Sequence, residues 1–270
     1  MAQTKIPNEL LEIGVNQIEA NSILISNDGG TGTIDSAIQN TGLGFEVFDD
    51  LTQGDYNTGI GYKTLTKLTT GSNNVAIGRA ALEANTTSNN NTAVGFAALE
   101  ANTTGTENSA VGSGALKTNT TGNYNTALGY ECLNASTTSQ ENTAVGYYAL
   151  GANTTGASNT AIGSAALDAA TTASNNVAVG KNALGANNAS SNVAVGSEAA
   201  AASTGVGNTA VGTSALAGAN TANYNTAIGN SALESNTSGS TNVAVGRNAL
   251  NANTTGSVNT ALGMRALDVS

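Results

Sequence analysis

Side chains able to do chemistry are few in this chain of 270 residues, which has no histidine, no tryptophan and a single cysteine. Histidine is the commonest acid–base group and metal ligand near neutral pH, so its absence removes the usual catalytic arrangements. Cys132 has no histidine to activate it. It stands beside Leu133, where other repeats of the chain carry alanine, which predicts a buried apolar residue. We therefore expect no catalytic residue, no cofactor and no enzymatic activity.

Aromatic side chains recur directly after a repeated glycine, at Tyr62, Phe96, Tyr130 and Tyr147. This position varies widely among the repeats, which is typical of a solvent-facing site. Aromatic rings there could stack on the sugar rings of a glycan, with the hydroxyl of tyrosine forming a hydrogen bond. Scattered surface aromatics are also ordinary in soluble proteins, so a glycan site and an unspecialised surface both remain open.

Acidic side chains recur five residues after the repeated glycine. They occur at Glu83, Glu100, Asp168, Glu234 and Asp268. About one carboxylate per repeat favours a solubilising edge, because glycoside cleavage needs two carboxylates close together. The polar turn at Asp28 also lacks the regular carboxylates of a calcium loop. We expect no metal site.

Charge and hydropathy restrict the partners of the chain. The net charge of -10 and the pI near 4.2 disfavour a nucleic-acid partner, because phosphate contacts require clustered lysine and arginine. No run of about 18 apolar residues is present, so no membrane insertion is expected. The first 30 residues also lack the basic and apolar regions of a secretory signal.

The dominant feature of the sequence is an internal repeat with the pattern N-[TVS]-[AG]-[VIL]-G. The spacing is 17 residues, shortened to 16 on either side of Gly196. Leucine follows each glycine by four residues, except at Ala200, and a polar segment such as N-T-T-G comes next. The thirteen repeated glycines are Gly61, Gly78, Gly95, Gly112, Gly129, Gly146, Gly163, Gly180, Gly196, Gly212, Gly229, Gly246 and Gly263.

The repeat predicts an all-β parallel β-solenoid, or β-roll, of about 13 coils over residues 57–270. A unit this short and this rich in Gly, Asn and Thr cannot supply the two helices of a helical repeat. Val75 and Ile77 flank a small residue, the period-2 pattern of a strand, and we expect their shared face to pack against Leu82 inside the coil. The N-T-T-G segment is then a turn.

Three positions define each coil, and all are expected to be structural. The asparagines should form a buried hydrogen-bonded ladder, the glycines a tight backbone corner, and the leucines the core. No Lys-[Ser/Thr] follows a glycine in a phosphate-binding frame. Representative residues are Asn74, Gly78 and Leu82, then Asn91, Gly95 and Leu99, then Asn142, Gly146 and Leu150.

One coil has about three apolar side chains, too few to fold alone, so neighbouring coils and further chains must add stability. Small residues such as Ala76 and Ala93 would let a second backbone approach closely. A homotrimer is the expected assembly.

The V-A-I-G motif at residues 75–78 and its copies resemble the head repeats of trimeric autotransporter adhesins, which are left-handed parallel β-rolls. The longer unit N-T-A-V-G-x-x-A-L-x-x-N-T-T-G is similar to repeats of phage and viral tail fibres. This resemblance covers residues 57–270 and implies a structural fibre on a virion surface, with attachment to a host-surface glycan as a further role. A bacterial adhesin head is the alternative, although its repeat is shorter.

Residues 1–56 lack the repeat. Leu10, Leu11 and Ile13 crowd apolar residues together, residues 23–25 read as a strand, and residues 27–32 read as turns. This segment is expected either to attach the fibre to other virion proteins and nucleate the trimer, or to cap the first coil. The sequence stops midway through a repeat at Ser270, and the open sheet edge leads us to expect processing, truncation or an adjoining protein there.

Two other functions fit a solenoid. An ice-binding protein is suggested by repeated threonine pairs such as Thr103-Thr104, although a flat array would need threonine at alternate strand positions. A β-helical lyase or hydrolase would need an interrupted repeat with clustered polar residues, and the repeat continues without such an insertion.

Overall fold

A computed structural model describes residues 23–25, 36–218 and 220–268. The protein is an all-β parallel β-solenoid of about 13 turns with a spacing of about 17 residues, and the described residues contain no helix. The fold class predicted from the repeat is therefore confirmed. The chain forms two compact units, Met1–Thr121 and Gly122–Ser270.

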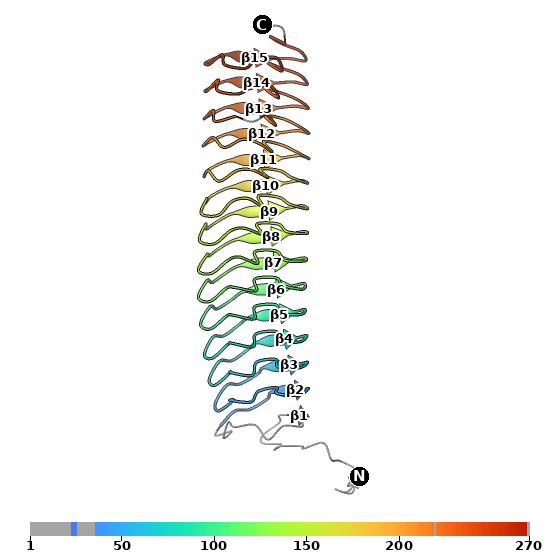
Figure 1. Cartoon of the computed structure of the whole chain (residues 1–270), viewed down its shortest axis with the longest axis vertical. Coiled ribbons are helices and arrows are strands. Elements are labelled where there is room, and N and C mark those ends of the chain that lie inside the picture. The colour runs from blue at the N-terminus through green and yellow to red at the C-terminus, as the bar shows by residue number, and fades with distance from the viewer. Residues whose placement is uncertain (1–22, 26–35, 219, 269–270) are drawn as a thin grey trace, which may run out of the picture. The chain divides into compact units, whose positions relative to one another are not determined.

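The first unit carries six strands of three residues each, and each strand pairs in parallel with the next in chain order (Figure 1). The predicted strand at residues 23–25 is present. The predicted turns at residues 27–32 and the apolar cluster near Leu10 lie outside the described residues. The strands are β1 (Ile23–Ile25), β2 (Thr41–Leu43), β3 (Thr58–Ile60), β4 (Val75–Ile77), β5 (Thr92–Val94) and β6 (Ser109–Val111).

The second unit repeats this arrangement with nine parallel strands. The two 16-residue steps leave the register intact, because Val177 pairs with Val193 and Val193 with Thr209. The strands are β7 (Thr126–Leu128), β8 (Thr143–Val145), β9 (Thr160–Ile162), β10 (Val177–Val179), β11 (Val193–Val195), β12 (Thr209–Val211), β13 (Thr226–Ile228), β14 (Val243–Val245) and β15 (Thr260–Leu262).

The coil interior holds the small strand residue, and the prediction that Val75 and Ile77 face inward was wrong. Ala76 between them is 0% exposed, whereas Ile77 is 37% exposed. The expected close approach of a second backbone at Ala76 is excluded for the same reason. Leu82 fills the interior opposite the strand and is fully buried, as predicted. The alternation of side chains along a strand correctly places Val75 and Ile77 on one face and Ala76 on the other. The interior of the thin coil has room only for the alanine beside Leu82, so the larger residues face outward.

The repeated asparagines form buried ladders within each unit. The Asn74 Nδ2 donates to Asn57 Oδ1 at 3.0 Å and to the Ser88 carbonyl at 2.9 Å. The same Asn57 Oδ1 accepts the Asn74 backbone N–H at 3.0 Å. Both asparagines are fully buried. In this ladder each asparagine thus supplies hydrogen-bond partners to the next coil, which offsets the cost of burying an amide.

The repeated glycine occupies a backbone conformation that few other residues adopt. Gly146 has φ of 133°, and a Cβ added there would lie 2.6 Å from the carbonyl oxygen of Gly163 in the next coil. Only glycine therefore lets successive coils stack this closely. Leu150 has φ of 52°, a left-handed turn that directs its side chain into the core.

The solenoid begins earlier than the predicted boundary at residue 57. Asn40 accepts hydrogen bonds from Asn57, and β2 pairs in register with β3. Residues 40–44 read N-T-G-L-G, a copy of the motif with glycine in place of alanine. This coil was missed because the polar segment before Asn57 differs from the N-T-T-G pattern.

Candidate functional site

In the first unit, the position after the glycine forms a stacked column that begins with Phe45 and Tyr62. Their ring centroids are 5.8 Å apart and their planes differ by 13°. The guanidinium of Arg79 lies 5.9 Å from the Tyr62 ring and 5.2 Å from the Phe96 ring. A planar cation therefore occupies the level between two aromatic rings, an arrangement favoured by the cation–π interaction.

In the second unit, the same position carries Tyr130 and Tyr147, and Tyr148 at the next position completes a cluster of three tyrosines. The rings of Tyr130 and Tyr147 are 5.5 Å apart and nearly parallel, at 9°. Tyr148 lies against both, at 5.9 Å from Tyr130 and 4.8 Å from Tyr147, with tilted planes. Offset and tilted contacts of this kind are the favoured geometries of aromatic pairs.

The tyrosine cluster includes a carboxylate. A hydrogen bond from its hydroxyl to Glu131, together with partial desolvation and the Glu131 charge, raises the pKa of Tyr148 to about 12. A hydrogen bond to the same carboxylate raises the pKa of Tyr130 above its usual value. Glu131 precedes Tyr148 by one coil, so this hydrogen bond draws the Tyr148 side chain back toward the coil of Tyr130.

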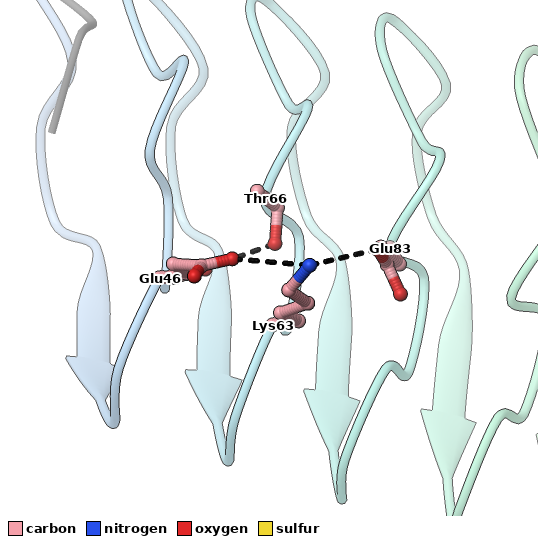
Figure 2. A network of polar contacts seen from close by, with 4 residues as sticks. All are labelled: Glu46, Lys63, Thr66 and Glu83. Carbon is pink, nitrogen blue, oxygen red and sulfur yellow. Dashed lines mark hydrogen bonds and ion pairs between the residues drawn. The ribbon is translucent and has the colours of Figure 1, made fainter.

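A small polar network lies beside the first aromatic column (Figure 2). The Lys63 ammonium lies 3.3 Å from Glu46 and 3.9 Å from Glu83, which belong to the coils on either side. The Thr66 hydroxyl donates to the Glu46 carbonyl at 2.9 Å. The hydrogen bond to Glu46 is the main cause that raises the pKa of Lys63. The network links three successive coils.

The predicted acidic edge consists of half-buried carboxylates, most of which have partners. Glu83 pairs with Lys63, and Glu100 with Lys117 at 3.5 Å. Glu234 accepts a hydrogen bond from Asn251. Desolvation raises the pKa of Asp168. No group of three or more Cys, Asp or Glu side chains placed to hold a metal ion was found in the described part of the chain.

Cys132 is fully buried, and its thiol donates a hydrogen bond to the Gly146 carbonyl. Burial raises the pKa of this thiol. A protonated and enclosed sulfhydryl is a poor nucleophile, so the environment of Cys132 is that of a small core residue.

In each unit, the outward face of the sheet carries two columns of side chains. One column is mainly threonine, and the other is made of Val, Ile and Leu. In the second unit, Ile162 is flanked by Val145 and Val179 in register, and all three are at least partly exposed. The exposed apolar members of the second column include Leu128, Ile162, Val195, Ile228 and Leu262.

The structure brings together two pairs of predicted site residues. Tyr130 stacks on Tyr147, and Tyr62 and Phe96 both contact Arg79. Sequence reasoning treated these as separate surface positions and missed Phe45 and Tyr148 as partners. The 17-residue spacing was the available signal, because it aligns equivalent positions in successive coils.

Comparison with protein-family models, curated proteins and solved structures found no match to this chain. None of the described residues lies in a helix long and apolar enough to cross a membrane.

Proposed function

We propose that this chain is a structural fibre protein of a virus particle, assembled as a homotrimer, and that it has no enzymatic activity. The observation that carries the proposal is the exposed apolar column on the outward face of the sheet. Ile162, Val195 and Ile228 are each more than a third exposed. Long apolar strips of this kind mark surfaces that bind another protein.

The outward face of the sheet is long and narrow. Nine strands in the second unit, at about 4.8 Å per strand, give a face about 40 Å long, and its two outward columns lie about 7 Å apart. The area is on the order of 300 Å², shared between the threonine column and the apolar column, so the case for an interface rests on the continuity of the apolar column along the sheet. Three copies around one axis would cover it, the arrangement that the adhesin-head resemblance implies.

The interior of the coil supports a structural role. Asparagine ladders, glycine corners and buried leucines occupy the repeating positions, and these groups maintain the stack. The part of residues 1–56 that precedes Asn40 remains the proposed attachment segment for other virion proteins, and a host-surface glycan the proposed ligand of a virion-surface fibre. The adhesin head is the alternative setting for the same assembly.

Light scattering on the full chain tests the assembly, with negative-stain electron microscopy of the same sample. We expect three times the chain mass in a rod. The paired substitutions Ile162→Glu and Ile228→Glu should reduce the mass to that of one chain, because charges would enter the buried interface. Thr155→Glu and Ser238→Glu add the same charge at exposed turns and should leave the mass unchanged. A wild-type monomer would contradict the proposal.

One observation favours ice binding as a second candidate function. Threonine and Val or Ile alternate on the outward face, as in Thr160 and Ile162, so the side chains form a regular flat array. The threonine pairs of the turns are not on this face. Val177, Val193 and Val243 interrupt the threonine column. Thermal hysteresis of a monomeric sample would support this function, and its absence would exclude it.

A further inference from the structure

The second aromatic column ends abruptly at Tyr147. One face of its ring is stacked on Tyr130, and Tyr148 leans toward the same side through its hydrogen bond with Glu131. The equivalent residue of the following coil is Ser164, an exposed side chain too short to cover the other face. Tyr147 is 58% exposed. The face of the Tyr147 ring that points away from Tyr130 is therefore open, because the short side chain of Ser164 does not cover it.

The first unit shows what an occupant of such a level looks like. There the planar guanidinium of Arg79 lies between the rings of Tyr62 and Phe96. Equivalent positions in successive coils are about 4.8 Å apart, which leaves room for a flat group to lie against the ring of the preceding coil. The second column offers the same spacing beyond Tyr147, with Ser164 at its base.

The polar groups nearby indicate the chemistry of a ligand. Ser164 supplies an exposed hydroxyl, and Lys181 stands in the same column two coils, or about 10 Å, beyond Tyr147. No ion pair joins the Lys181 ammonium to a carboxylate among the described residues. An apolar platform with hydroxyl and ammonium donors beside it suits a ring that has one apolar face and a polar rim.

We propose that the open face of Tyr147, with Ser164 and Lys181 beside it, binds a pyranose ring of a surface polysaccharide. The inference rests on the proposed fibre function, since it gives the attachment role a site and a ligand class. A nucleobase would also stack on a tyrosine, but the net charge of -10 opposes a polyphosphate chain. Lys181 would contact a hydroxyl or acidic substituent on the next sugar.

Binding of the full chain to an array of neutral and acidic pyranose oligosaccharides tests the site, followed by calorimetry with the best-bound oligosaccharide. We expect Tyr147→Ala to weaken binding about tenfold, the loss of one aromatic contact. Ser164→Arg should abolish binding while the chain stays folded, because a guanidinium would lie against the Tyr147 ring as that of Arg79 lies against Tyr62. Binding by the Ser164→Arg variant tests the site even if Tyr147→Ala unfolds the chain.

Two matched controls place a change away from the site. Tyr224→Ala removes an exposed tyrosine outside the column, and Thr213→Arg adds a guanidinium to the column far from Tyr147. Both should bind as the wild type does. Failure of every oligosaccharide to bind, or unchanged binding by Ser164→Arg, would overturn the inference.

Light scattering on the same samples separates this inference from the fibre proposal. A trimer without glycan binding refutes only the glycan site. Glycan binding by a monomer refutes only the trimeric fibre.

Discussion

Asn142 and Asn159 are joined by two hydrogen bonds across successive coils, in which Asn142 Oδ1 accepts the Asn159 backbone N–H at 3.0 Å and its Nδ2 at 3.1 Å. Asn142 Nδ2 in turn donates to Asn125 Oδ1 at 3.2 Å and to the Gly156 carbonyl at 2.9 Å. One buried amide thus connects three coils.

Replacement of Asn142 by alanine should lower the free energy of unfolding by about 2–4 kcal/mol, because a buried backbone N–H and other polar groups lose partners. Denaturant unfolding at fixed protein concentration measures the loss. Asn259→Ala is the matched control. Among the described residues Asn259 ends the ladder, and it donates to Asn242 without accepting from a further coil. An equal cost at both positions would contradict the ladder argument.

Gly146→Ala and Gly263→Ala separate backbone strain from contact between coils. Both glycines have positive φ, 133° and 120°. A Cβ at position 146 would meet the Gly163 carbonyl oxygen at 2.6 Å, whereas a Cβ at position 263 meets nothing within 4 Å. We expect strain alone, about 1–3 kcal/mol, for Gly263→Ala, and a larger loss for Gly146→Ala. Thermal unfolding of the two variants, compared with the wild type, measures the strain from Gly263→Ala and the added clash between coils from Gly146→Ala.

Ala170 interrupts a second ladder, which elsewhere joins Asn102 to Asn119 at 2.9 Å and Asn236 to Asn253 at 3.1 Å. In the coil before Ala170, the buried Asn153 Oδ1 accepts no hydrogen bond among the described residues.

Ala170→Asn should supply the missing donor and raise the free energy of unfolding by about 1 kcal/mol. Ala170→Leu, which has the branching of asparagine but a larger volume and no amide, tests whether packing alone explains a gain. Stabilisation by leucine equal to that by asparagine would refute the hydrogen-bond explanation. Denaturant unfolding compares the two variants.

Tyr148 should titrate with a pKa of about 12, above the ordinary value of 10, since its hydroxyl donates to Glu131. The folded state favours the neutral phenol. Its contribution to stability is therefore complete below pH 10 and is lost as the pH rises from 10 toward 12. Ultraviolet absorbance of tyrosinate, with Tyr148→Phe subtracted, follows this titration.

Glu131→Gln removes the carboxylate and should move the Tyr148 pKa back toward 10. The control Glu141→Gln changes a carboxylate that hydrogen-bonds Ser158 and should leave the titration in place. A Tyr148 pKa that stays near 12 without the Glu131 carboxylate would show that desolvation, rather than the hydrogen bond, causes the shift.

The sequence by itself determined the class of fold, because the repeated N-x-[AG]-x-G pattern aligns each coil with the next. The same spacing predicted the asparagine column, the glycine corners and the buried leucines at positions such as Asn74, Gly78 and Leu82. These features follow from local backbone preferences and from the period of the repeat, both of which can be read along a single chain.

Only the tertiary structure decided which side of the strand faces inward. Alternation places Val75 and Ile77 together, but the narrow space beside Leu82 admits Ala76 and turns the larger residues outward. The contacts of Arg79 with Tyr62 and Phe96, and of Tyr148 with Glu131, likewise depend on side-chain directions in neighbouring coils. Spacing brings such residues to the same column, whereas their rotamers and the room between coils determine whether they touch.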